Sequence, residues 1–201
     1  MAKIRLTKSE LKTQRDALKR FQRYLPTLQL KKQQLQLEVQ RAREKLAQLR
    51  RELDEIEAAV QKWVLLLDSP DVAALPDLLR VQNWQVRIRN VAGIDAPVFE
   101  QIEFERGEFD LFATPAWFDD ALDAARQLVE LRLRRELLEE QRDLLEQELR
   151  IVTQRVNLFE KVKIPEAREN IRRIQIYLGD QQTSAVGRAK LAKEKSQTRA
   201  L

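Results

Sequence analysis

The chain has 201 residues, of which 34% are charged and 43% are hydrophobic, and its formal net charge is +5. It contains no cysteine and no histidine, which excludes disulfides, thiol nucleophiles, imidazole acid–base catalysis and the usual zinc ligand sets. No apolar segment typical of a signal peptide follows the basic N-terminus, and no apolar run is long enough to span a membrane, so we expect a soluble, intracellular protein.

The first predicted element is a long helix. Over residues 18–67 the apolar positions recur in alternating steps of three and four, and only Lys32 interrupts them. This is the pattern of the apolar seam of a coiled coil. We expect Thr7 or Ser9 to cap the start of the helix. We expect Pro26 to kink the helix without ending it, because the apolar register continues unshifted beyond it.

The middle of the chain has a different pattern. Pro70 marks the end of the first helix, and residues 71–79 predict a short helix. Two β-rich runs, 81–91 and 98–105, predict a hairpin that is punctuated by Gly93 and Pro97. Because an isolated two-stranded hairpin is marginally stable in water, we expect it to pack on a neighbour or a partner. Its candidate docking residues are Trp84, Val86, Ile88, Val98, Ile102 and Phe104.

A second long helix is predicted to begin with Thr114 as its cap and Pro115 at its first position. Its apolar series runs over residues 121–159 with the same steps of three and four, so the two helices can fold back as an antiparallel pair. The Ile164–Pro165 pair predicts a second kink or break, and Gly179–Asp180 predicts a local stop before helical spacing resumes in the basic tail.

Together these elements predict an all-α dominated fold, in which a long antiparallel two-helix coiled coil encloses a small middle segment with a β-hairpin. The predicted domains are 1–68 (N-terminal coiled-coil helix), 69–114 (middle segment with the short helix and hairpin) and 115–201 (C-terminal coiled-coil helix with a basic tail). The predicted seam comprises Leu35, Val39, Leu46, Leu49, Leu53, Ile56, Leu145, Leu149, Val152, Val156 and Phe159.

Charge is unevenly distributed along the chain. Residues 1–23 carry eight Lys and Arg against two acids, and residues 187–201 carry five against one, whereas the middle is acidic. In an antiparallel pair both basic ends would lie at the same tip. One interpretation is a pair of solvated, frayed ends, and the other is a tip that meets an acidic or phosphate-bearing partner.

The second helix carries arginines at two seam positions. Arg135 and Arg142 are seven residues apart. They can act as polar breaks that set the helix register, with packed stems and exposed heads. Alternatively, the seam opens there to admit another subunit.

No catalytic constellation is evident. The four glycines, at 93, 107, 179 and 187, are too scattered for a phosphate-binding loop. The carboxylates of the second helix, Glu146 beside Arg150 among them, are interpreted as surface charge neighbours and not as an acid–base pair. We therefore expect no enzyme activity, no cofactor and no metal site.

Several stretches carry a family resemblance. They are Leu-Lys-Lys-Gln-Gln-Leu at 30–35, Arg-Val-Asn-Leu-Phe-Glu-Lys-Val-Lys-Ile-Pro at 155–165, Asn-Ile-Arg at 170–172 and Ile-Gln-Ile-Tyr-Leu-Gly-Asp at 174–180. In these stretches and in its helix–hairpin–helix layout, the chain resembles the D subunit of the rotary V-type/A-type ATPases. Pro26 departs from that family's pattern.

The resemblance implies a non-catalytic rotor shaft, the central stalk that transmits torque between ATP sites and proton or sodium translocation. The implied partners are the A and B subunits of the ring, a C/d-type adaptor at the membrane rotor and a small F subunit. The implied location is cytoplasmic and peripheral to the membrane, without insertion into it. Candidate contacts to the ring are Lys3, Arg5, Lys8, Arg188, Lys190 and Lys193.

Two other functions fit parts of the sequence. A coiled-coil scaffold or tether could use the hairpin as its binding module, and such scaffolds usually form symmetric dimers. Nucleic-acid binding through the basic ends is less consistent, because few aromatic residues accompany them and no nucleic-acid-binding module is present. We expect no nucleic-acid partner.

Overall fold

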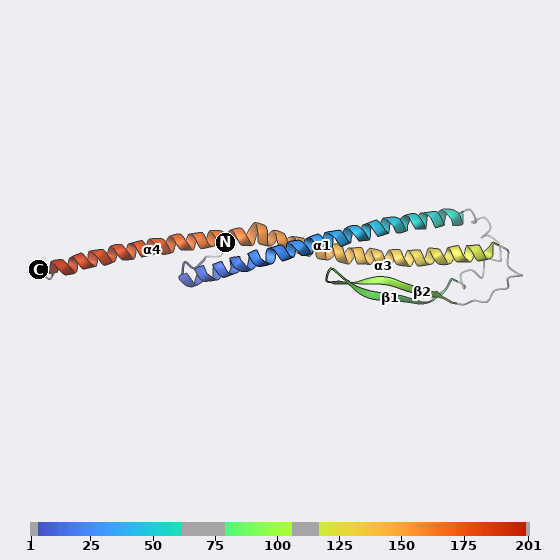
Figure 1. The fold of residues 1–201 in the computed structure, drawn as a ribbon, viewed down its shortest axis with the longest axis horizontal. Helices are drawn as coiled ribbons and strands as arrows, with labels where there is room; N and C mark the ends of the chain where they lie inside the picture. The colour runs from blue at the N-terminus through green and yellow to red at the C-terminus, as the bar shows by residue number, and fades with distance from the viewer. Residues whose placement is uncertain (1–3, 62–78, 106–116, 200–201) are drawn as a thin grey trace. The chain divides into compact units, whose positions relative to one another are not determined.

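The computed structural model describes residues 4–61, 79–105 and 117–199. Its elements, in chain order, are α1 (Lys8–Gln61), β1 (Val81–Val91), β2 (Ile94–Phe104), α3 (Phe118–Asn157), the π-helix η2 (Leu158–Lys163) and α4 (Ile164–Arg199) (Figure 1). Long N- and C-terminal helices with a small antiparallel hairpin between them confirm the predicted fold class. None of the helices in the described ranges is long and apolar enough to cross a membrane.

The chain divides into two compact units. One is Gln33–Arg150, and the other joins Met1–Lys32 to Ile151–Leu201 and is called here the terminal unit. The predicted short helix over 71–79 and the predicted start at Thr114 and Pro115 lie largely or wholly outside the described residues. The described part of the second long helix begins at Phe118, where Ala121 N–H donates to the Trp117 carbonyl oxygen at 3.0 Å.

In the Gln33–Arg150 unit, α1 and α3 run antiparallel. Three ion pairs join the two helices. From one ion pair to the next, the residue on α1 lies seven positions later and its partner on α3 lies seven positions earlier. The pairs are Arg43–Glu146 at 2.8 Å, Arg50–Glu139 at 3.4 Å and Glu57–Arg132 at 2.9 Å. Every one of these six residues directly follows an apolar seam position, so the ion pairs flank the buried seam as charged residues do in coiled coils.

The hairpin has a two-residue turn. Ala92 and Gly93 both have positive φ, 53° and 82°, which is the geometry of the tight hairpin turns that match the strand twist. Asn90 supports the turn, since its side-chain oxygen accepts a hydrogen bond from Gly93 N–H at 3.1 Å. β1 pairs with β2 along its length, with register shifts between Val81 and Asn83 and between Gln85 and Val86.

Pro97 does not interrupt the second strand, which begins at Ile94 and not at residue 98 as the sequence suggested. Pro97 lies opposite Ile88, three pairs from the pair that closes the turn. Because hydrogen-bonded and non-hydrogen-bonded pairs alternate from the turn outward, Pro97 falls at a non-hydrogen-bonded position. Its missing N–H therefore costs no ladder bond.

In the terminal unit, α1 begins with a side-chain cap. Glu10 N–H donates to Thr7 Oγ1 at 3.2 Å, so of the two predicted caps Thr7 is the one used. Phe21 of α1 stacks at a tilt on Phe159, with 5.1 Å between ring centroids. Nearer the start of α1, the Asn170 amide donates to Gln14 Oε1 at 3.4 Å. Ile174, close to this contact in sequence, is fully buried.

Two prolines lie within the helices of the terminal unit. Pro26 is exposed, and α1 continues through it, as the unshifted register predicted. Before Pro165 the helix widens into the π-helix, where Ile164 N–H donates to the Phe159 carbonyl oxygen five residues back. A proline obstructs the carbonyl four residues before it, and a local π register relieves that conflict. The expected irregularity is therefore a π-turn, and the chain continues directly into α4.

The predicted stop at Gly179–Asp180 is wrong, because α4 runs from Ile164 to Arg199 without interruption. A glycine inside a helix costs about 1 kcal/mol relative to alanine, which weakens a helix but does not end it. Thr183 Oγ1 donates to the Gly179 carbonyl oxygen at 3.1 Å, within the helix. Every side chain described from Asp180 to Lys195 is exposed, so no described part of the chain covers this end of α4.

Candidate interaction surfaces

Strand β2 holds the hairpin against α3. The Arg126 guanidinium lies over the Phe104 ring at 5.6 Å, and the Arg134 guanidinium lies over the Phe99 ring at 4.9 Å. The two arginines are eight residues apart, so they share one side of α3. Ala96 of β2 is fully buried. These contacts fix the hairpin to its helix, and Figure 1 shows it alongside α3.

Strand β1 exposes apolar side chains. Trp84, Val86 and Ile88 are 45%, 38% and 72% exposed, and they alternate along the strand, so they share one face. Their cross-strand partners are Ile102, Phe99 and Pro97, and of these Phe99 contacts Arg134 of α3. Of the six predicted docking residues, the three on β1 are therefore exposed, and Val98, Ile102 and Phe104 on β2 are half-buried.

The predicted seam residues differ in burial. Leu35, Val39, Leu46, Leu53, Leu145, Val152 and Val156 are buried, whereas Leu49, Ile56, Leu149 and Phe159 are half-buried. Ala42 and Leu131, which also fall in the 3,4 series, are buried as well, and so is Leu137. Leu137 lies outside the 3,4 series, and it lines a groove together with residues of α1 and of the hairpin.

The basic candidates lie at different levels of the terminal unit. Lys3 is outside the described residues, and Arg5, Lys8, Arg188, Lys190 and Lys193 are exposed. From the contact of Gln14 with Asn170, α1 extends back about 9 Å to Lys8, whereas α4 continues about 27 Å to Arg188, at 1.5 Å per residue. Both basic ends therefore lie toward the same end of the terminal unit, as expected, but at different levels, because α4 runs well past the start of α1 (Figure 1).

The two seam arginines are half-buried and reach acids of their own helix. Arg142 is paired with Asp143 at 2.7 Å, and this hydrogen bond raises the pKa of the Arg142 guanidinium above its ordinary value. Arg135 Nε lies 4.0 Å from Glu139 and has no hydrogen bond within the described chain. Packed stems with heads turned to neighbouring acids match the register-setting interpretation.

Sequence reasoning missed two sets of contacts. The interhelical ion pairs could have been found from the heptad spacing of Arg43, Arg50 and Glu57 beside the seam. Glu146, interpreted as a neighbour of Arg150, instead pairs with Arg43 of the facing helix. No pattern of neighbouring residues in the sequence predicts the stacking of Arg126 and Arg134 on the hairpin phenylalanines, because this stacking depends on where the hairpin folds back. Within residues 4–61, 79–105 and 117–199, no group of acidic side chains could hold a metal ion.

Comparison with known proteins gives a consistent result. A sequence model of the family described as the D subunit of ATP synthase matches residues 10–194. The V-type ATP synthase D subunit of Borreliella burgdorferi is 42% identical over 96% of this chain and 95% of its own length. The proteins of the same name from Chlamydia pneumoniae and Chlamydia abortus are 33% and 34% identical, each over 98% of this chain and over 94% and 96% of their own lengths.

Proposed function

The chain belongs to the ATP synthase D subunit family, and from this premise we propose that it is the central rotor shaft of a V/A-type rotary ATPase. In this role it passes torque between the ring of A and B subunits and the sector that moves protons or sodium across the membrane. The observation that carries the proposal is the family match over residues 10–194, which includes both long helices and the hairpin.

The shaft is proposed to be non-catalytic. The chain has neither the thiol nor the imidazole on which much acid–base and nucleophilic catalysis depends. The carboxylates Glu139 and Glu146 are engaged in ion pairs with arginines of α1. Their role in this proposal is to hold two helices in register so that a twist applied to one is carried by both.

The exposed end of α4 supports insertion into the subunit ring. Most of a helix's stability in a protein comes from packing of its apolar face, and this end has no packed face among the described residues and contains Gly179 and Gly187. Its apolar Val186 and Leu191 are more than half exposed. We propose that the A and B subunits enclose this end of α4 and that Arg188, Lys190 and Lys193 contact them there. We propose that Lys3, Arg5 and Lys8, at the start of the chain, also contact the ring.

The hairpin is proposed to dock the rotor's other subunits. Two arginine–phenylalanine contacts of β2 hold the hairpin against α3, and the β1 residues Trp84, Val86 and Ile88 are exposed. We assign this face to the small F subunit, with a C/d-type adaptor linking the stalk to the membrane rotor. The chain would then be cytoplasmic and peripheral to the membrane as a member of the complex.

The test is the stoichiometry of the native complex. The fraction of a gentle membrane extract that contains this chain is isolated without a tag and measured by native mass spectrometry. We expect one copy of the chain with three copies each of two large nucleotide-binding subunits. A homodimer, or partners without nucleotide-binding subunits, would instead identify a coiled-coil scaffold that uses the hairpin as its binding module.

A further inference from the structure

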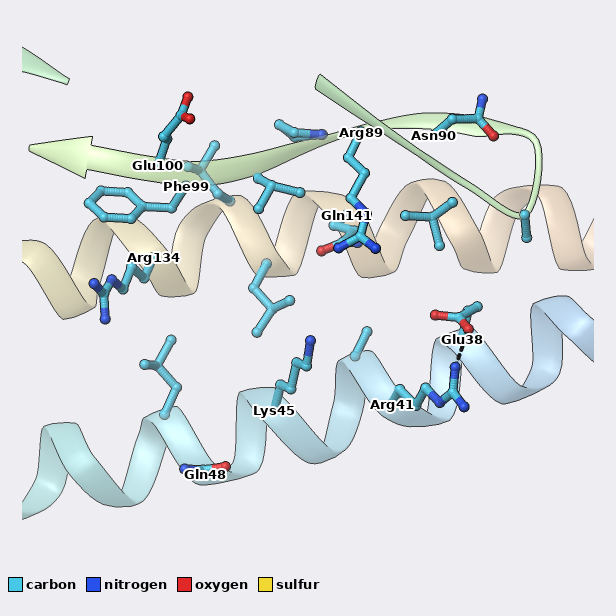
Figure 2. Close-up of a pocket in the computed structure, with 18 of the residues that line it drawn as sticks. Glu38, Arg41, Lys45, Gln48, Arg89, Asn90, Phe99, Glu100, Arg134 and Gln141 are labelled. Carbon is cyan, nitrogen blue, oxygen red and sulfur yellow. Dashed lines mark hydrogen bonds and ion pairs between the residues drawn. The ribbon is translucent and has the colours of Figure 1, made fainter. Parts of the chain in front are cut away.

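A groove of about 900 Å³ lies within the Gln33–Arg150 unit, bordered by α1, α3 and the hairpin. Figure 2 shows its walls: Lys45 comes from α1, Gln141 from α3 and Arg89 from β1, and the three side chains reach into the same space. Leu49, Leu137 and other apolar residues contribute to the lining, so it combines apolar surface with charge.

The charges of the groove are not balanced among themselves. Its three carboxylates already have partners: Glu38 pairs with Arg41 at 2.6 Å, Glu52 accepts from Gln48 at 3.0 Å, and Glu100 lies 3.8 Å from Arg87. The lining arginine of α3, Arg134, is paired with Glu130 and stacked on Phe99.

Lys45 and Arg89 remain, and neither side chain makes a hydrogen bond or ion pair with any described residue. Two like charges that point into one space repel each other, and an anion between them converts that repulsion into two attractions. We propose that this groove binds an acidic segment of a partner protein, with one of its carboxylates between Lys45 and Arg89.

The dimensions favour a protein segment over a small ion. The lining of α1 runs from Gln34 to Glu52, which is about 27 Å at 1.5 Å per residue. That length accommodates several turns of helix or an extended peptide, and the apolar lining offers surface for its uncharged side chains. Exposed ion pairs are individually weak, so the apolar contacts must supply much of the binding energy.

The proposal rests on the proposed function in one respect, namely that the partner is sought within the assembled ATPase. The intact complex is treated with a water-soluble carbodiimide, which joins a lysine amine to a carboxylate in direct contact, and the products are mapped by mass spectrometry. We expect Lys45 to be joined to an Asp or Glu of another subunit. In the Lys45→Arg complex this product is lost, because arginine keeps the charge but does not form the amide.

A second experiment tests the groove by reversing its charge. The Lys45→Glu/Arg89→Glu variant is compared with Arg51→Glu/Arg172→Glu, which changes net charge equally at exposed residues outside the groove. We expect retention of the cross-linked subunit to fall at least about tenfold in the groove variant relative to the control. Retention by the unsubstituted chain should fall with rising salt, because salt screens the attraction between the groove and an acidic segment.

Three outcomes overturn the proposal. In the first, Lys45 is joined only to acids of its own chain, or to none, in a complex of the expected stoichiometry. In the second, both charge-reversal variants retain the partner equally. In the third, inorganic phosphate protects Lys45 of the isolated chain from acetylation and no protein cross-link forms, which indicates a small-anion site. Each leaves the rotor assignment intact, because that assignment depends on the stoichiometry of the complex alone.

Discussion

Arg43 of α1 donates two hydrogen bonds, from Nε and Nη2, to the same Oε1 of Glu146 on α3, at 3.1 and 2.8 Å. The contact joins residues 103 positions apart in the sequence, and equivalent pairs follow it at intervals of one heptad. A seam of interchangeable leucines would tolerate a slip of one heptad. Flanking charges oppose such a slip because it would place Arg50 opposite Arg132, or Glu57 opposite Glu139. The ion pairs therefore determine register more than they add stability.

Reversing one charge of the Arg43–Glu146 pair should cost about 1 kcal/mol, because both side chains are exposed. Arg43→Glu and Glu146→Arg should each lower the free energy of unfolding in urea, and the double variant should recover most of the loss. A coupling free energy near zero in this cycle would show that the ion pair contributes nothing to the pairing of the two helices.

The buried seam should be far more sensitive than the helix surface. Leu35 is 0% exposed and Leu30, on the same helix, is 61% exposed. Leu35→Ala should lower the free energy of unfolding by about 2–5 kcal/mol, since it leaves a cavity in a thin core. Leu30→Ala is the matched control and should change it by less than about 0.5 kcal/mol. Similar losses for the two variants would mean that Leu35 is not enclosed by the facing helix in solution.

The seam could be predicted from sequence because helical periodicity is local: residues three and four apart share a face whatever the rest of the chain does. Leu35 and Val152 follow from that rule alone. The Arg134–Phe99 contact does not, because it depends on how a hairpin separated by many residues folds back on α3. The continuation through Gly179 was missed for a different reason: glycine weakens a helix by an amount that neighbouring turns can offset, so the residue type alone does not fix an end.

Pro26 should destabilise the helix that contains it. It removes the hydrogen bond that would reach the Gln22 carbonyl, and its side chain is exposed, so replacement loses no core packing. Proline is about 3 kcal/mol less favourable than alanine inside a helix, while its stiffening of the unfolded chain offsets up to about 1 kcal/mol. Pro26→Ala should therefore raise the free energy of unfolding by about 2 kcal/mol, measured in urea. The neighbouring exposed Thr27→Ala is the control, and a loss of stability in Pro26→Ala would contradict this account.

The hairpin turn should respond to substitutions that change its preference for positive φ. Ala92 has φ 53° and Gly93 has φ 82°. Ala92→Asn should stabilise the hairpin by up to about 1 kcal/mol, because asparagine adopts the left-handed region more readily than alanine. Gly93→Ala should destabilise it by about 1–2 kcal/mol for the converse reason. Amide hydrogen exchange of β1 and β2 measures both effects, and equal protection in the two variants would exclude this turn geometry.

The exposed face of β1 should be needed for docking and not for folding. Ile88 is 72% exposed, so Ile88→Asp should change the free energy of unfolding by less than about 0.5 kcal/mol. The same change places a charge in the middle of the proposed contact with the small rotor subunit and should weaken that binding at least about tenfold, measured by titration calorimetry. Gln85→Asp adds the same charge to the same strand on the opposite face and should bind normally, since Gln85 is exposed and alternates with Trp84 and Val86. Normal binding by both variants would show that the docking site is not on this face. Weakened binding by both would indicate a general effect of negative charge on β1.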